Sequence, residues 1–293
     1  MKCTIVIVSY NTKELTRNCL KSILTKKWEN EFEEVISDNN SLDGTTELIK
    51  KEFPNIKVIK NKENLGFSKG CNIVLKQTKS PFYLLLNSDT IVPDFSLDNL
   101  LKFVQENNYH IASCKLLNTD KTLQPNAGDL PTFLSVFTWL SNLDDFFPNL
   151  PSFHRKNKGY YKDEKEVGWV GGTAMMIKGE VLEKIGLLDE NIFMYGEDVE
   201  YCLRAKKSDL HIGWTDKAQV VHLGGASSKN PYFSQWLGEF RGLIFIYKKY
   251  YGNLSAYFIQ LLIYFFTFVR IIIYLILGKI KFSMNYAKVL INI

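Results

Sequence analysis

The sequence predicts an α/β protein with a mixed, mostly parallel sheet, helices on both faces, and membrane-associated helices at the C-terminus. Three observations lead to this prediction. Strand and helix patterns alternate through residues 1–115, which favours parallel strands joined by helical crossovers. Residues 3–9 form a continuous apolar, β-branched run, which is typical of a strand buried on both faces. Residues 240–293 hold many aromatic and basic side chains but no Asp or Glu.

The alternating elements can be assigned in chain order. The strand at residues 3–9 precedes apolar residues at helical spacing over 15–24, a short strand at 34–37 and a helix at 45–53, which Pro54 ends. The same reasoning places strands at 56–59, 82–86 and 110–114, and helices at 68–77 and 97–106.

Residues 116–166 are less regular and contain four prolines and a charged run at 154–165. We expect an insertion or acceptor-side loop region here, within the same domain. Order returns over residues 167–177 and 179–185, with a helix at 199–206 and strands at 211–214 and 218–222. The expected organisation is a catalytic domain at 1–235, with halves 1–115 and 116–235, and a helical tail at 236–293.

Composition and charge exclude several classes of protein. With 46% hydrophobic residues, 23% charged residues and 8 Pro, the chain is neither disordered nor fibrous. The seven cations of residues 240–293 exceed the net charge of +5, so the preceding 239 residues are slightly acidic. The basic character therefore belongs to the tail, and we expect no nucleic-acid partner.

Five cysteines are widely spaced, and none forms a C-x-x-C pair. The odd number and the spacing argue against a disulfide framework or a zinc site, so we expect most of them to be small buried apolar residues in a reducing compartment. The N-terminus enters a strand directly and shows no signal-peptide pattern. We therefore expect the catalytic body to be cytoplasmic.

Polar side chains gather where the expected strands end. Residues 9–11 follow the first strand, Asp38 follows the second, and residues 87–89 follow the most apolar strand of the body. In open α/β sheets, ligands bind beyond the carboxyl ends of the strands. A carboxylate at the end of a buried strand is costly without a donor or cation, which singles out Asp38. Asp89 suits a divalent cation held together with substrate phosphates, although a loop cap also explains it.

An acidic pair, Glu197 and Asp198, opens the expected helix at 199–206. Carboxylates at this position interact favourably with the helix dipole, but two adjacent carboxylates also suit a general base whose pKa is tuned by its neighbour. His222 ends an apolar strand, level with Asp89. It is either a structural histidine or a ligand.

Taken in order, these strings resemble a known family. Residues 5–11, 38–45, 64–67 and 85–89, together with Asn72, resemble family 2 inverting glycosyltransferases, which have the GT-A fold. The later strings at 171–177, 186–190 and 193–198, with His222, resemble the rhamnosyltransferase-like branch. The resemblance covers about residues 2–228, and six weak motifs in the right order make it specific.

The resemblance implies a role for each matching residue. Asp38 would bind the uracil or thymine of a nucleotide sugar, and Asp89 of the Asn87-Ser88-Asp89 motif would bind Mg²⁺ or Mn²⁺. His222 would be a second metal or diphosphate contact. Asp198 would be the general base, with Glu197 as the alternative. The residues expected around the nucleotide sugar are Ser9, Tyr10, Asn11, Asp38, Asn40, Asn64, Gly66, Phe67, Asn72, Asn87, Ser88 and Gly172.

The expected activity is metal-dependent transfer of a sugar, with rhamnose the leading candidate, from a dTDP- or UDP-linked donor. The acceptor implied is a lipid-linked saccharide in cell-surface polysaccharide synthesis. One alternative, a sugar-nucleotide nucleotidyltransferase, requires a Gly-rich basic loop after the first strand, which residues 9–12 lack. Another alternative is a membrane-tethered protein that binds a nucleotide sugar without catalysis. It is compatible with Asn87, which departs from the strict DxD-type metal motif of the family, but it leaves the Glu197–Asp198 pair unexplained.

Residues 254–278 contain one formal charge, Arg270, and as a helix would be about 37 Å long, enough to span a hydrocarbon core of about 30 Å. An arginine at the centre of a spanning helix would cost about 2.5–3.5 kcal/mol of insertion free energy. Because the cations on the two sides of the segment are nearly balanced, the positive-inside rule predicts no orientation for such a helix. On a helical wheel, one arc of the tail collects polar or amphipathic residues: Asn253, Tyr257, Gln260, Tyr264, Thr267, Arg270, Tyr274 and Lys281.

We therefore expect one or two helices lying in the membrane interface, with cations on anionic headgroups and aromatic rings at the boundary. A spanning helix and a soluble core or oligomer helix are the alternatives. The expected location is the cytoplasmic face of the cell membrane. Oligomerisation stays open.

Overall fold

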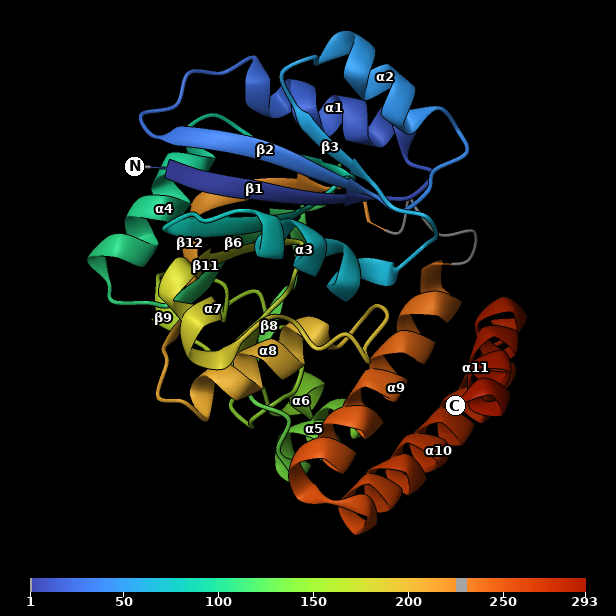
Figure 1. Cartoon of the computed structure of the whole chain (residues 1–293). Coiled ribbons are helices and arrows are strands. Elements are labelled where there is room, and N and C mark those ends of the chain that lie inside the picture. Colours follow the sequence, from blue (N-terminus) through green and yellow to red (C-terminus); the bar gives the residue numbers. More distant parts are fainter. Residues whose placement is uncertain (1, 225–230) are drawn as a thin grey trace.

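The computed structural model describes residues 2–224 and 231–293 (Figure 1). Within them, the main sheet runs in the order β3-β2-β1-β4-β11-β6-β12-β5. The strands are β1 (Lys2–Ser9), β2 (Glu31–Asp38), β3 (Lys57–Lys60), β4 (Phe82–Asn87), β5 (Thr90–Ile91), β6 (Ile111–Leu117), β11 (Ala174–Lys178) and β12 (Ile212–His222). β1 to β4 are parallel and so are β6 and β12, whereas β11 is antiparallel to both its neighbours. The prediction of a mixed, mostly parallel sheet is confirmed.

Helices cover both faces of this sheet. α1 (Lys13–Leu24), α2 (Thr45–Glu52) and α4 (Ser96–Glu106) pack on one face, and α3 (Gly66–Gln77), α7 (Gly179–Ile185) and α8 (Glu197–Lys206) pack on the other. Successive side chains of β1 alternate between the two layers: Ile5 and Ile7 join the first, and Val6 joins the second. A strand buried on both sides explains why its sequence is uniformly apolar.

Residues 116–166 contain more regular structure than expected. β7 (Leu123–Gln124) pairs with β6, β8 (Ala127–Gly128) pairs with β10 (Trp169–Val170), and β9 (Lys165–Glu166) pairs with β12. Two helices, α5 (Phe133–Ser141) and α6 (Leu143–Phe146), also lie here. The signal for α5 is a capping box in which Thr132 and Ser135 bond each other's backbone N–H groups.

The two strands expected at 211–214 and 218–222 form one strand, β12. Its pairing with β6 shifts register between Thr215 and Gln219. This irregularity accommodates the polar residues that interrupt the apolar pattern, so the strand bends and continues instead of ending. The prediction that most of the cysteines are buried is confirmed, since all five are.

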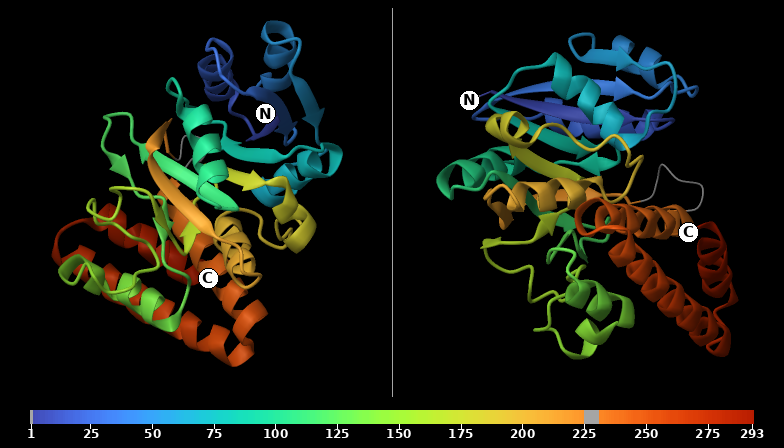
Figure 2. Two further views of the ribbon diagram at one scale, coloured as in Figure 1. Left: turned by 90° about the vertical axis from the view of Figure 1, so that its left-hand side faces the viewer. Right: turned by 60° about the horizontal axis from the view of Figure 1, so that its bottom comes forward.

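The tail forms three helices, α9 (Pro231–Tyr251), α10 (Asn253–Ile276) and α11 (Ile280–Asn292), where one or two were expected. They lie beside α5 and α6, at the end of the body remote from α1 and α2 (Figure 2). Among the described residues, α10 is the one helix long and apolar enough to cross a membrane. The expected domain boundary between residues 235 and 236 falls inside α9.

The middle of the polar arc, at Thr267 and Arg270, faces the protein, which corrects the expectation that this cation lies among headgroups. Thr267 and Arg270 are buried, and Arg270 Nη2 donates to the Leu140 carbonyl at 2.7 Å. The guanidinium also lies over the Trp236 ring, 5.6 Å from its centroid. Leu140 at the end of α5 and Trp236 of α9 hold the buried cation, whose Nη1 has no hydrogen-bond partner in the described chain, and the apolar face of α10 turns outward.

Candidate active site

A cleft of about 570 Å³ opens where β1 and β4 end, and α9 forms part of its wall. It brings together polar groups that are far apart in the sequence. Of the residues expected in the site, the following line it: Tyr10, Asn64, Gly66, Phe67, Asn87, Ser88, Asp89, Gly172, Glu197, Asp198 and His222. Topology explains this meeting, because the carboxyl ends of parallel strands share one edge of a sheet.

Five of the expected residues, Ser9, Asn11, Asp38, Asn40 and Asn72, are not among those lining the cleft. Ser9 is buried, and its hydroxyl bonds the hydroxyls of Thr12 and Thr16 at 2.9 and 3.1 Å. This packing ties the end of β1 to the start of α1.

The other polar groups after β1 and β2 join the two loops to each other. Asn11 accepts at Oδ1 from the N–H of Leu42, and its own N–H donates to Ser41 Oγ, each at 2.8 Å. Asn11 and Asn40 both have positive φ angles, a conformation that asparagine tolerates better than most residues. These residues therefore shape the turns next to the cleft.

Asp38 is fully buried at the end of β2. Its Oδ1 accepts from Ser41 Oγ at 2.5 Å, and its Oδ2 accepts from Thr46 Oγ1 at 2.8 Å and from the Ser41 N–H at 3.3 Å. The expected need for donors is thus met inside its own loop. A carboxylate has about four acceptor positions, so one remains for a further donor.

Asn72 is buried on α3 and holds the segment before the acidic pair. Its side chain donates to the Leu188 carbonyl at 2.9 Å and to Glu190 Oε1 at 3.0 Å, and it accepts from the Leu188 N–H at 3.1 Å. This geometry gives Asn72 a positioning function at a distance from the cleft.

Gly66 and Phe67 connect the two halves of the site. The Phe67 N–H donates to the Phe193 carbonyl at 2.8 Å. Gly66 has a φ of +76°, and a Cβ there would lie 2.3 Å from the same carbonyl oxygen. Only glycine allows the backbone segments to approach this closely.

Asp89 and His222 meet because β5, which follows Asp89, pairs antiparallel with the end of β12. Asp89 Oδ1 lies 3.2 Å from His222 Nε2, and the Asp89 carbonyl accepts from the Leu223 N–H at 2.9 Å. The expected proximity of the two residues is therefore present, and both face the cleft.

A chain of side-chain amides orients the His222 ring. Gln124 Oε1 lies 2.6 Å from His222 Nδ1, and Gln124 Nε2 donates to Asn118 Oδ1 at 3.1 Å. Asn118 in turn donates to Thr122 Oγ1 at 2.9 Å. Because Gln124 Oε1 can only accept, Nδ1 is the donor in this contact and Nε2 is the ring nitrogen that faces Asp89, as the ligating nitrogen of a metal-binding histidine does.

The acidic pair lies at the N-terminus of α8, after Gly196, whose φ is +96°. Asp198 Oδ2 accepts from the Gly172 N–H at 2.9 Å, and its Oδ1 accepts from the Val199 N–H at 2.8 Å. Glu197 is more deeply buried, and its Oε2 has no hydrogen-bond partner in the described chain. Burial raises the pKa of both carboxyls, and the charge of Asp198 raises that of Glu197 further.

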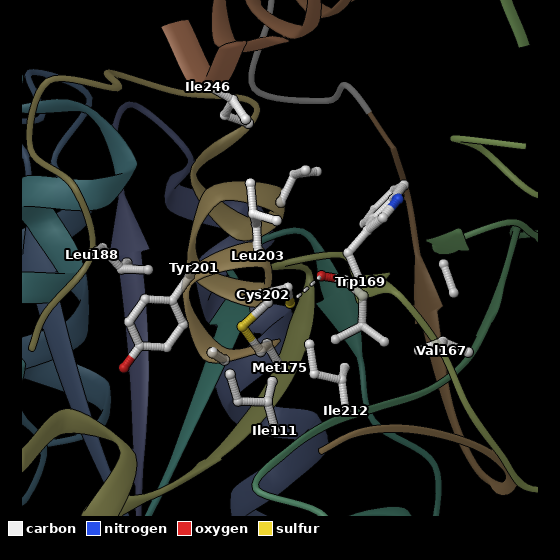
Figure 3. Close-up of a cluster of buried hydrophobic side chains, with 14 of the residues drawn as sticks. Ile111, Val167, Trp169, Met175, Leu188, Tyr201, Cys202, Leu203, Ile212 and Ile246 are labelled. Atoms are coloured by element: carbon white, nitrogen blue, oxygen red, sulfur yellow. Dashed lines mark hydrogen bonds between the residues drawn. The ribbon is translucent and has the colours of Figure 1, made fainter. Parts of the chain in front are cut away.

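Hydrophobic packing fixes α8 in place. Figure 3 shows Tyr201, Cys202 and Leu203 among Ile111, Met175 and Ile212 of the sheet, with Ile246 of α9 on the far side. At the helix surface, Glu200 bonds Arg204, Lys249 and Tyr250, so α8 is also tied to α9 by ion pairs. The N-terminus of α8 therefore has little freedom to move.

α9 also packs tightly on the loop before the acidic pair. A Cβ at Gly238 would lie 2.5 Å from Tyr195 Cδ2, and a Cβ at Gly242 would lie 2.7 Å from the Tyr195 carbonyl oxygen. The two glycines lie one turn apart on one face of α9. Their small size lets the helix contact the backbone of Tyr195 and Gly196.

The charges around the cleft favour a divalent cation. Asp89, Glu197, Asp198 and Glu239 line it, whereas none of its described lining residues is Lys or Arg. The described chain contains no group of three or more His, Cys, Asp or Glu side chains suited to a metal. Asp89 and His222 could hold an ion only if it takes its remaining ligands from substrate phosphate and water, as Mg²⁺ usually does.

Sequence reasoning missed several groups at the cleft: Asn118, Gln124, His154, Gln235 and Glu239. Gln124 and Asn118 lie in a short hairpin within the region expected to be loop, and nothing local marks them. Glu239 does carry a signal, because it is the last acidic residue of the chain and lies in an apolar stretch.

Comparisons with known proteins agree with this geometry. The family model described as "Glycosyl transferase family 2" matches residues 4–184. The low-salt glycan biosynthesis hexosyltransferase Agl10 of Haloferax volcanii is 28% identical over 223 residues, which cover 75% of this chain and 66% of that protein. The N-acetylglucosaminyl-diphospho-decaprenol L-rhamnosyltransferase of Mycobacterium tuberculosis is 24% identical over 202 residues, covering 64% and 65%. The chain thus spans just under two thirds of the length of these relatives.

Solved structures show the same fold. S. aureus TarS 1–349 in complex with UDP has a TM-score of 0.56 at 17% identity, covering 91% of this chain and 70% of that one. The mannosyltransferase PcManGT from Pyrobaculum calidifontis, in complex with GDP-Man and Mn²⁺, has a TM-score of 0.58 at 16% identity, covering 86% and 64%. The fold is that of GT-A glycosyltransferases.

Proposed function

The chain belongs to glycosyl transferase family 2, and we propose that it transfers a sugar from a nucleoside-diphosphate donor to a hydroxyl of a lipid-linked saccharide. The product would be a precursor of a cell-surface polysaccharide. One observation carries the proposal: the Asp89–His222 contact and the Asp198 carboxylate line the same cleft. Such a cleft offers one wall for a metal-bound diphosphate and another for a base.

The residues proposed to hold Mg²⁺ or Mn²⁺ are Asp89 and His222, with Gln124 orienting the ring. The bound ion would neutralise the diphosphate leaving group. The cleft supports this role because its described side chains carry several carboxylates and no basic residue to balance the phosphates. PcManGT, a structural neighbour, was solved with Mn²⁺.

Asp198 is the proposed general base, with Glu197 as the alternative. Asp198 is the less buried of the two and receives N–H groups at both oxygens, which orients the carboxylate. The acceptor hydroxyl would give its proton to Asp198 as its oxygen attacks the anomeric carbon and the bond to the diphosphate breaks. A single in-line displacement inverts the anomeric centre.

The donor proposed is dTDP- or UDP-linked, and rhamnose is the leading sugar. The mycobacterial relative is named an L-rhamnosyltransferase, and TarS was solved with UDP, whereas PcManGT was solved with GDP-Man. Asp38, with one acceptor position left, is the proposed partner of the N–H of the base. The loops after β1 and β2 would form the wall of the nucleotide pocket.

A lipid-linked acceptor suits the tail. A second cavity of about 200 Å³ lies among α9, α10 and α11 and is lined by Tyr232, Trp236, Tyr274, Phe282, Asn285, Tyr286 and Val289. Tyr232 also lines the main cleft, so the two cavities adjoin. The outward apolar face of α10 supports contact with the cytoplasmic face of a membrane, with residues 1–235 as the catalytic part and 236–293 as the tail.

The two alternatives are less well supported. A nucleotidyltransferase needs basic side chains around the phosphates, and the described lining of the cleft has none. A binding protein without catalysis would gain nothing from an oriented Asp198 carboxylate facing the cleft.

A panel of UDP-, dTDP- and GDP-sugars tests the proposal. We expect one donor to bind only with Mn²⁺ or Mg²⁺, by calorimetry, and to release nucleoside diphosphate faster with an N-acetylglucosaminyl-diphospho-prenol acceptor. Asp89→Ala should abolish both effects while the melting temperature stays near that of the wild type. Metal-independent binding of every donor, or full activity of the variant, would contradict the assignment.

A further inference from the structure

The cleft continues past Asp198 into a region that the proposed donor and metal groups do not use. Its walls come from three parts of the chain: Asn126 beyond β7, the middle region with Phe153, His154 and Trp169, and α9 with Gln235 and Glu239. Helix α9 of the tail therefore forms part of the wall of the cleft.

Glu239 and His154 face each other across this region. Gln235 Nε2 donates to Glu239 Oε1 at 2.9 Å, and Glu239 Oε2 lies 3.6 Å from His154 Nε2. The second distance is too long for a direct hydrogen bond. A hydroxyl oxygen to one side of the line that joins the two atoms would be within bonding range of both.

At neutral pH the His154 ring is uncharged, whereas the Glu239 carboxyl is only partly protonated. Burial raises the pKa of Glu239 to about 7, and the charge of Asp198 adds to the effect. Burial lowers the pKa of His154 to about 3, so its ring is uncharged and no ion pair forms. His154 Nε2 is buried and has no hydrogen-bond partner in the described chain. Buried polar atoms normally have partners, so this atom is an expected ligand contact.

The surroundings are aromatic. The His154 ring packs 4.9 Å from Trp139, 4.6 Å from Phe153 and 4.9 Å from Trp169, measured between ring centroids. Tyr195 and Tyr232 also line the cleft. Apolar walls with a few placed polar groups are typical of sites for neutral organic ligands.

Resting on the proposed function, we propose that Glu239, His154 and Gln235 form the subsite for the acceptor saccharide and select a neutral sugar unit. One acceptor hydroxyl bonds Glu239 and His154, while the reacting hydroxyl faces Asp198. A carboxylate-bearing sugar is rejected, because the described lining of the cleft holds four carboxyl groups and no Lys or Arg. Glu239 acts in binding and takes no part in the proton transfer.

Saturation-transfer NMR with UDP and Mn²⁺ present tests this directly. The probes are methyl glycosides of glucose, N-acetylglucosamine and rhamnose, with methyl glucuronide as the anionic comparison. We expect a neutral glycoside to bind and the glucuronide not to bind. Glu239→Gln should weaken binding of the neutral glycoside at least tenfold. Equal binding of the glucuronide, or an unchanged variant, would overturn the proposal.

His154→Phe is the second variant, because it keeps a ring among the aromatic neighbours and removes the nitrogen. It should fold, bind UDP and Mn²⁺ normally, and lose glycoside affinity. Glu180→Gln, an exposed carboxylate outside the cleft, is the matched control and should change nothing. Loss of UDP and Mn²⁺ binding in His154→Phe would contradict a separate acceptor subsite.

The two proposals fail in different ways. If glycosides bind through Glu239 but no nucleotide sugar is turned over, the transferase proposal fails and the subsite stands. If turnover occurs and Glu239→Gln leaves both the acceptor KM and glycoside binding unchanged, the subsite fails and the transferase proposal stands.

Discussion

Asp198 and Glu197 are neighbours in the sequence, but their environments differ. Asp198 accepts two backbone N–H groups and reaches the cleft, whereas Glu197 is buried with an oxygen that has no partner in the described chain. Two adjacent buried carboxyls repel each other's charge, so the more buried one keeps its proton more readily. This division favours an ionised Asp198 beside a protonated Glu197.

Asp198→Asn should therefore lower the transfer rate by about 10²–10⁴-fold, the usual contribution of a general base. The amide keeps the shape but cannot take the proton, so binding of the nucleotide donor should persist. Glu197→Gln, which resembles the protonated acid, should retain most of the activity. Rate measurements with saturating donor and acceptor compare the two, and the opposite order would make Glu197 the base.

Gln124 would affect metal binding indirectly, because it orients the ring of His222. Gln124→Leu removes the acceptor at His222 Nδ1, so the ring loses its preferred orientation. Affinity for Mn²⁺ in the presence of UDP should fall by about 10–100-fold, as is usual when such supporting hydrogen bonds are lost. Gln124→Glu keeps an acceptor and should restore much of the affinity. Calorimetric titration with Mn²⁺ measures both, and equal affinities for Mn²⁺ would rule out the orienting role.

At the scale of elements, α9 connects the tail with the catalytic loop. Gly238 and Gly242 of α9 pack against Tyr195, and Glu239 lines the cleft. Lys249 and Tyr250 of the same helix bond Glu200 of α8. Tyr195 has a φ of 69°, an uncommon conformation for a bulky residue. The surrounding contacts hold it there, so the position of the acidic pair depends on α9.

Gly242→Ala should destabilise the protein and impair transfer together. The added Cβ would lie 2.7 Å from a backbone oxygen, so helix and loop must separate, at a cost of about 1–3 kcal/mol. Thermal melts and transfer assays measure the two effects. Lys248→Ala, at an exposed position of the same helix, is the control. Full activity of Gly242→Ala would show that α9 does not set the loop.

At the scale of the whole molecule, α10 presents an apolar face that the described residues of the chain leave uncovered. Phe258, Phe265 and Phe268 of α10 are exposed, and Lys279 and Lys281 follow at the start of α11. A face of this kind matches a membrane surface, with the rings below the headgroups and the cations among anionic lipids.

Phe265→Ser with Phe268→Ser should therefore reduce co-sedimentation with vesicles of phosphatidylglycerol and phosphatidylcholine. Neutral phosphatidylcholine vesicles should bind the wild type less, and added salt should weaken the anionic binding because it screens the lysines. Leu42→Ser, at an exposed residue of the body, is the control. Equal sedimentation of all three proteins would argue against this face as the membrane contact.

Glu239 links stability to pH. Its pKa rises from 4.5 to about 7 on folding, so its favourable contribution is present below pH 4.5 and is lost as pH rises through 7. Relative to wild type, Glu239→Gln should become more stable as the pH rises, by up to about 3 kcal/mol at pH 8. Urea unfolding at pH 5 and pH 8 measures the difference. A difference independent of pH would contradict the shift.

The sequence by itself determined the alternating core, the buried cysteines and the strand ends where polar groups collect. These follow from local patterns: an apolar run that must be buried, and ligand positions that parallel strands place at one edge. The sequence also placed His222 level with Asp89, but the sheet order, the β5–β12 pairing that brings the two into contact and the orienting Gln124 required the tertiary structure, because β5 pairs with a strand more than a hundred residues later.

In the tail, too, the sequence determined some features and the tertiary structure determined others. Composition marked residues 240–293 as different, but it did not show which face of α10 would turn inward. The Leu140 carbonyl and the Trp236 ring decided that, since they give Arg270 a place to be buried. Likewise, Glu239 became part of the cleft only when two glycines let α9 approach Tyr195. Contacts between segments remote in sequence set both outcomes, and the sequence marks Glu239 only as an isolated acid in an apolar stretch.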